Sequence, residues 1–132
     1  MSETSDRNLA LMQRTLRAFQ AGDMATLTEV FDENVVWRVP GRNPMAADYR
    51  GRDATFAFFG RLMEATGGTF KVESLDMLAN DRGGVFVDRL TASREGRSLD
   101  VRLMLHVTIR DGRIVEGVDH VHQEHLWDAF WA

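Results

Sequence analysis

The second half of the chain has the pattern of strands joined by tight turns, and this restricts the fold more than any other feature. Apolar and polar residues alternate over residues 99–110, which places every second side chain on one face of a strand. Glu95-Gly96 precedes this segment and Asp111-Gly112 follows it, and such pairs between alternating segments are typical of two-residue hairpin turns. We therefore expect an antiparallel meander with strands at 70–79, 85–93, 99–110 and 113–121.

The first half has helical periodicity instead. Apolar residues recur at three- and four-residue steps over 9–19 and 24–31, and Gly22 and Asp23 between them are stop and start signals. A short strand at 35–39 and a loop at 41–51 precede a third helix, which runs from about Asp53 to Gly67-Gly68, and residues 123–131 form a last helical turn. Helices first and strands afterwards predict an α+β fold, in a single domain over residues 1–132.

Composition excludes several classes of function. The 132 residues include no cysteine, which excludes a disulfide scaffold, a zinc ribbon and a thiol nucleophile. The net charge is -4, whereas a nucleic-acid surface normally has a basic excess, so no nucleic-acid partner is expected. No apolar run has the length of a membrane span, and residues 1–6 are too acidic for a signal peptide. We expect a cytoplasmic protein without membrane contact.

Several short motifs occur in an order and spacing that resemble a known family. The motifs are Asn34-Val-Val-Trp37 before Pro40-Gly41, Tyr49-Arg-Gly51, Gly67-Gly68-Thr69, Arg94-Glu-Gly96-Arg97, Arg110-Asp-Gly112-Arg113-Ile114-Val-Glu116 and Asp128-Ala-Phe-Trp131. Together they resemble the SnoaL-like polyketide cyclase and ketosteroid-isomerase-like branch of the NTF2-like superfamily, over nearly the whole chain. The resemblance implies a curved, mostly antiparallel sheet wrapped around three helices as a cone with an apolar cavity. It also implies no metal and no cofactor, and many such proteins are dimers.

The hairpin turns predict which side chains face such a cavity. If both turns have two residues, Asp88 and His120 lie opposite Leu103 on its two neighbouring strands. The expected inner face then carries Phe86, Asp88, Leu90, Leu99, Val101, Leu103, Leu105, Val107, Glu116, Val118, His120 and His122. The opposite face, with Met104 and Asp119, is mixed in polarity and suits a homodimer contact. A shift of one residue in the register would exchange the two faces.

Asp88, His120 and His122 are the candidate catalytic residues on this inner face. Burial raises the pKa of a carboxyl group and lowers that of an imidazole, so such a pair provides a base and an acid near neutral pH. The alternative is that Asp88 and His120 only satisfy each other, or bond to Arg89 or Tyr49, without a catalytic role.

The resemblance also shows where this chain departs from the family. Cyclases of this kind carry an acid–base Asp at the end of the last strand, where this chain reads Asp119-His120-Val-His122. Either a histidine has taken over that role or the cyclase chemistry is absent. The two histidines, with Glu124 and His125, also have the spacing of a zinc or iron site, although the resemblance implies no metal.

Ligand contacts are expected from a set of mostly aromatic residues around the cavity. They are Phe19, Trp37, Tyr49, Phe59, Met63, Phe86, Leu103 and Val118. Taken together, the sequence favours a cofactor-free enzyme or binder of a small apolar molecule with a carbonyl group, which it would isomerise, cyclise or dehydrate by moving a proton. The alternatives are a non-catalytic carrier or sensor with the same cavity, and a structural dimer whose cone is filled by its own aromatic residues.

Overall fold

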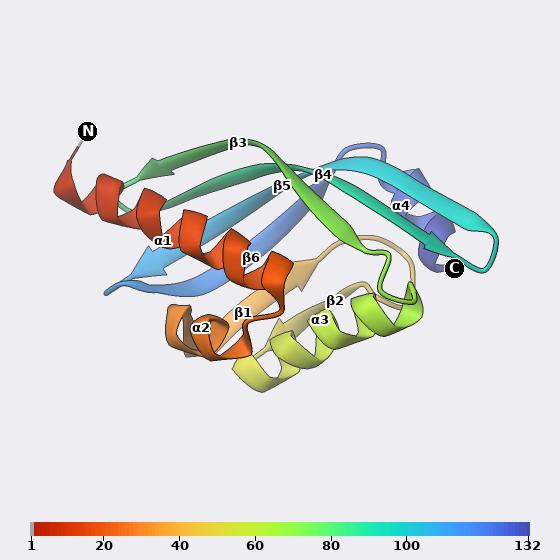
Figure 1. Ribbon diagram of the computed structural model, residues 1–132, viewed down its shortest axis with the longest axis horizontal. Coiled ribbons are helices and arrows are strands. Elements are labelled where there is room, and N and C mark those ends of the chain that lie inside the picture. The colour runs from red at the N-terminus through yellow and green to blue at the C-terminus, as the bar shows by residue number, and fades with distance from the viewer. Residues whose placement is uncertain (1) are drawn as a thin grey trace.

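The computed structural model describes residues 2–132 as one curved sheet with helices along one of its faces (Figure 1). The helices are α1 (Glu3–Ala21), α2 (Met24–Val30), α3 (Arg52–Ala65) and α4 (Glu124–Trp131). The strands are β1 (Phe31–Val39), β2 (Ala47–Arg50), β3 (Lys71–Asn80), β4 (Gly83–Arg94), β5 (Arg97–Arg110) and β6 (Arg113–Val121). The α+β class and the mostly antiparallel curved sheet predicted from the sequence are confirmed.

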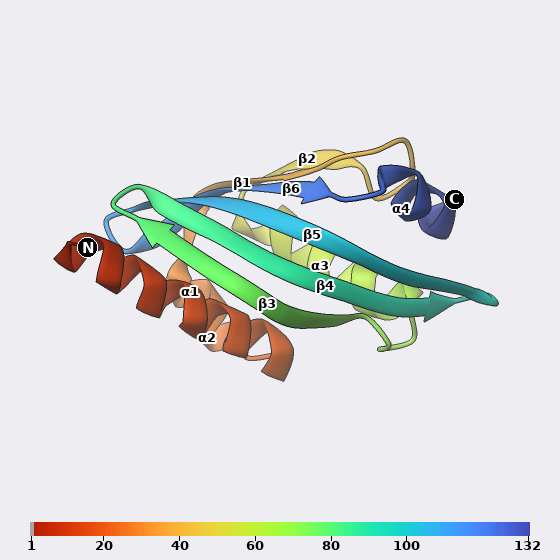
Figure 2. The same ribbon diagram turned by 90° about the horizontal axis from the view of Figure 1, so that it is seen from above.

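The strand order is β2-β1-β6-β5-β4-β3, and neighbours are antiparallel except for the parallel pair β1 and β6. Figure 2 shows the long strands β3, β4 and β5 passing over α3, with α1 alongside β3 and α4 at the end where the β4–β5 hairpin projects. The helices thus cover the concave face, and a pocket lies beneath the sheet. Within residues 2–132, no helix combines the length and the apolar character that a membrane crossing requires.

Local signals account for most of the element boundaries. Gly22 adopts the left-handed conformation that ends α1, and the Asp23 side chain accepts a hydrogen bond from the backbone N–H of Thr26 to start α2, as predicted. The first helix begins at Glu3, because Ser2 is its N-cap and Ser5 completes a capping box. The segment predicted as a loop at 41–51 contains the short strand β2, which pairs with β1.

The predicted pairing of β4 with β5 is confirmed, whereas the predicted pairing of β5 with β6 is wrong beyond the first two residues of β6. The hairpin turn has the expected form, and Ile109 lies opposite Ile114. Thr108 then lies opposite Glu116, so that Val115 is an extra residue in β6. This β-bulge shifts the rest of the strand by one residue relative to β5.

The bulge reverses the predicted facing of the end of β6. Leu105 lies opposite Asp119, and Met104 lies opposite His120. Because successive side chains point to opposite faces, Asp119 faces inward and His120 faces outward. The same shift moves Val118 to the outer face, where it lies opposite His106.

Candidate functional site

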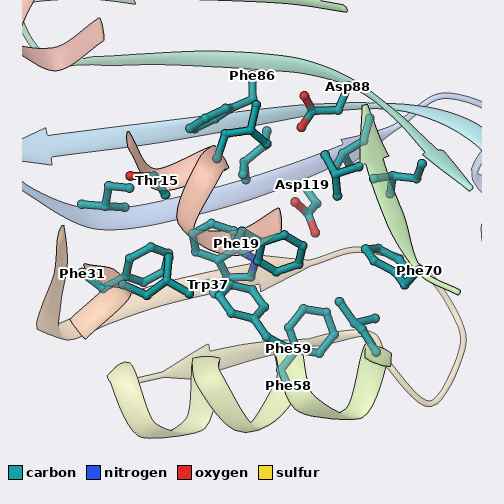
Figure 3. Close-up of a pocket in the computed structure, with 18 of the residues that line it drawn as sticks. Thr15, Phe19, Phe31, Trp37, Phe58, Phe59, Phe70, Phe86, Asp88 and Asp119 are labelled. Atoms are coloured by element: carbon teal, nitrogen blue, oxygen red, sulfur yellow. The ribbon is translucent and has the colours of Figure 1, made fainter. Parts of the chain in front are cut away.

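A cavity of about 80 Å³ lies between the concave face of the sheet and helices α1, α2 and α3 (Figure 3). Eight aromatic residues line it: Phe19, Phe31, Trp37, Phe58, Phe59, Phe70, Phe86 and Trp127. Phe59 meets the rings of Phe19 and Trp37 edge-to-face, with ring centres 5.3 and 5.4 Å apart. Such perpendicular contacts fix the rings relative to one another, so the wall is a packed aromatic layer.

Trp37 reaches the cavity because its neighbour on β6 is Gly117. The two residues are paired across the parallel β1–β6 contact, and the Trp37 ring lies over the glycine. A Cβ atom at Gly117 would come within 2.4 Å of the Trp37 ring. A glycine inside a strand commonly marks such a close approach.

Two carboxyl groups interrupt this apolar wall. Asp88 on β4 and Asp119 on β6 both line the cavity, and Figure 3 shows both side chains directed into it from the sheet. Asp88 is 3% exposed and Asp119 is 7% exposed. Among the described residues, the Oδ1 atom of Asp88 finds no hydrogen-bond donor. None of the described side chains that line the cavity is basic, so neither carboxyl group has a counter-ion there.

This environment disfavours the charged form of both groups. Burial raises the pKa of Asp88 to about 7. Burial also raises the pKa of Asp119 to about 7, with a further contribution from the negative charge of Asp88. Two interacting carboxyl groups titrate as a pair, so near neutral pH the site holds about one proton between them.

The structure brings five of the eight expected ligand contacts into the cavity wall, together with the expected Asp88. These five are Phe19, Trp37, Phe59, Phe86 and Leu103.

The other three lie elsewhere. Met63 is on the outer side of α3 and is 39% exposed. Val118 lies on the outer face of the sheet because the bulge shifts this part of β6 by one residue. Tyr49 packs behind the cavity wall, stacked on Phe58 at 4.5 Å, and its hydroxyl group donates to the carbonyl oxygen of Met45.

The predicted placement of His120 and His122 on the inner face is wrong. Both side chains are exposed, because the bulge in β6 turns them outward and brings Asp119 inward. The missed residue, Asp119, occupies the position at which the family resemblance placed an acid–base Asp. Within residues 2–132, no three His, Asp or Glu side chains are grouped so that they could hold a metal ion.

The short helix α4 closes one end of the cavity and is tied to two neighbouring segments. Its Trp127 lines the cavity. Asp128 accepts hydrogen bonds from the backbone N–H of Arg42 (2.8 Å) and from the side chain of Asn43 (2.7 Å). Arg94, near the tip of the β4–β5 hairpin, donates to the carbonyl oxygen of Phe130 at 3.0 Å. These contacts fix α4, and therefore Trp127, against the sheet.

The sequence matches the SnoaL-like domain over residues 12–117. The chain belongs to the SnoaL-like domain family. The matched region includes Asp88 and most of the cavity wall, whereas Asp119 and Trp127 lie just beyond it.

Relatives and solved structures agree with this assignment. An uncharacterized protein of Mycobacterium tuberculosis is 39% identical over 130 residues, which are 98% of this chain and 99% of the relative. The structure of Bal32a, from a soil-derived mobile gene cassette, is 42% identical with a TM-score of 0.95, and covers 98% of this chain and 100% of Bal32a. A putative SnoaL-like polyketide cyclase from Jannaschia is 17% identical with a TM-score of 0.82, over 100% of this chain and 96% of its own; this likeness concerns the fold alone.

Proposed function

We propose that this SnoaL-like protein is a cofactor-free acid–base enzyme. It removes a proton from a carbon beside the carbonyl group of a small apolar molecule and returns a proton at another position. Asp88 is the base and Asp119 is the acid. The observation that supports the proposal is the convergence of two buried carboxyl groups on one apolar cavity without a counter-ion.

The chemistry follows from the single proton that the pair holds near neutral pH. Ionised Asp88 takes the proton from carbon, the electron pair of the C–H bond forms a C=C bond, and the π electrons of the carbonyl group move onto its oxygen. Protonated Asp119 donates a hydrogen bond to that oxygen while its negative charge develops. Asp119 is assigned as the acid because both its burial and the charge of Asp88 disfavour its ionised form. Return of a proton to a different carbon completes an isomerisation; loss of a hydroxyl group or ring closure are the related outcomes.

The size of the cavity bears on the size of the substrate. Sites for drug-sized ligands have volumes of roughly 300–1,000 Å³, and this cavity has about 80 Å³. Phe19 and Phe59 are the aromatic residues of the wall that remain partly exposed. The proposed substrate is therefore a compact molecule, or a larger one that displaces these two rings.

Proton abstraction can be tested before the substrate is known. Small cyclic ketones are incubated with the protein in deuterated water, and NMR measures deuterium at the carbon beside the carbonyl group. We expect protein-dependent exchange, which Asp88→Asn and Asp119→Asn each reduce by about 100-fold or more, since general acid–base catalysis typically contributes 10²–10⁴-fold. His120→Asn, a change on the exposed outer face, is the matched control and should leave the exchange rate unchanged.

The same experiment addresses the alternative of a non-catalytic carrier. A carrier binds these ketones, and Asp88→Asn leaves its affinity nearly intact, but it exchanges no deuterium. If the unmodified protein binds the ketones but exchanges no deuterium, the protein is a carrier and the proposal that it is an enzyme is wrong.

We also propose that two copies associate through the outer face of the sheet. Leu78 and Met104 are 58% and 52% exposed on this face. Val85 and Val118 lie on the same face, in one row across the sheet with Leu78, and are half-buried. Burial of such side chains against a second copy removes apolar surface from water.

A further inference from the structure

We propose that the indole N–H of Trp127 is a hydrogen-bond donor to the bound ligand, and that the ligand carries both a carbonyl oxygen and a hydroxyl group. The carbonyl oxygen accepts from Trp127 and the hydroxyl group donates to Asp88. This inference rests on the proposed function and adds to it a ligand class and a second binding group.

The first observation is an unpaired donor beside the cavity. Trp127 is 1% exposed and lines the cavity, and its Nε1 atom is buried without an acceptor among the described residues. Buried N–H groups in proteins are paired in the great majority of cases, and each exception needs an explanation. Because Trp127 borders a cavity, a ligand atom can supply the missing acceptor.

The second observation is an unpaired acceptor on the same cavity. The Oδ1 atom of Asp88 is also buried without a partner among the described residues. The two groups have opposite requirements, since an indole N–H only donates and an ionised carboxylate oxygen only accepts. A purely apolar ligand would satisfy neither group. A molecule with an acceptor at one end and a donor at the other satisfies both.

The donor is also held in place. Trp131 meets the Trp127 ring edge-to-face at 5.5 Å. Asp128 and Arg94 tie the helix to the 42–43 segment and to the β4–β5 hairpin. A donor fixed before binding loses little conformational freedom when the ligand arrives. The indole N–H of Trp127 also keeps its proton at every physiological pH, whereas protonated Asp119 can lose its proton.

Three small probes of similar shape isolate the two hydrogen bonds. The compound 4-hydroxybutan-2-one carries both groups, butan-1-ol lacks the carbonyl group, and pentan-2-one has a methyl group in place of the hydroxyl group. Dissociation constants are measured by ligand-observed NMR. We expect 4-hydroxybutan-2-one to bind about two- to tenfold more tightly than either analogue, since one hydrogen bond contributes roughly 0.5–1.5 kcal/mol.

Trp127→Phe removes the N–H and keeps an aromatic ring. It should reduce the preference for 4-hydroxybutan-2-one over butan-1-ol by about fivefold and leave the preference over pentan-2-one in place. Trp131→Phe is the matched control: its Nε1 is likewise buried and unpaired among residues 2–132, but Trp131 does not line the cavity. An unchanged preference in Trp127→Phe, or an equal loss in both variants, would overturn the inference.

A measurement on the unmodified protein covers the case in which Trp127→Phe does not fold. The indole N–H proton of Trp127 should move downfield in the NMR spectrum when 4-hydroxybutan-2-one binds and much less with butan-1-ol. An unmoved Trp127 signal on saturation would also overturn the inference. If the aspartate variants lose deuterium exchange while Trp127 shows neither effect, the proposed function stands and this inference alone fails.

Discussion

Asp88 and Asp119 determine how stability depends on pH, because the folded state binds their protons more tightly than the unfolded state does. Their folded pKa values of about 7 lie above the ordinary pKa of 3.8 for an aspartate. Between pH 4 and 7 the folded protein therefore holds more protons, and the free energy of unfolding falls as pH rises through this window. Above pH 7 the dependence levels off, since both states have then lost these protons.

Replacing Asp88 by Asn should accordingly stabilise the protein at high pH. Asn has the shape of a protonated Asp and cannot ionise, so it avoids the cost of a buried charge. We expect the free energy of unfolding of Asp88→Asn to exceed that of the unmodified protein by a few kcal/mol at pH 8, and by much less at pH 5. Urea unfolding at the two pH values measures this difference. An equal difference at both values would mean that Asp88 is not held neutral by burial.

At the level of elements, the sequence predicted the helices, the long strands and the β4–β5 register, because each depends on local signals such as Gly22, Asp23 and the Glu95-Gly96 turn. The composition of the site depends on a shift of one residue in the pairing of β6 with β5. The residues of the hairpin turn do not determine this shift. Val115 is the extra residue, and the β6 side chains that follow it point to the face opposite to the predicted one. Gly117 inside that strand was the available signal, since interior glycines mark bulges and close backbone approaches.

The α4 helix offers a prediction at the same scale. Asp128 is the acceptor that ties α4 to the 42–43 segment, and Asp128→Ala removes two hydrogen bonds at once. We expect a loss of about 1–3 kcal/mol in unfolding free energy, because each of the two hydrogen bonds contributes roughly 0.5–1.5 kcal/mol. Hydrogen exchange should become faster at residues 42–46. Glu124→Ala, at an exposed position of the same helix, is the control, and an equal effect of both variants would contradict a specific role for Asp128.

For the whole molecule, one face of the sheet holds the proposed site and the other holds the proposed contact between copies. A charge placed in that contact should separate the copies, because each copy would bring a carboxylate into the same contact and remove it from water. Met104→Glu should shift the protein from dimer to monomer in sedimentation experiments. Met63→Glu, an exposed methionine on α3, should leave the dimer intact. A monomeric unmodified protein, or a dimer that persists in Met104→Glu, would rule out this contact.

The proposed chemistry requires that Asp88 and Asp119 share a proton near neutral pH. A carbon-13 NMR titration of the two carboxyl groups tests this requirement most directly. We predict that the pair titrates in two coupled steps around neutral pH, and that Asp88→Asn lowers the pKa of Asp119 by removing its negative neighbour. If both groups instead titrate near pH 4, each would be fully ionised at neutral pH. No proton would then remain for Asp119 to donate, and the acid–base assignment would be wrong.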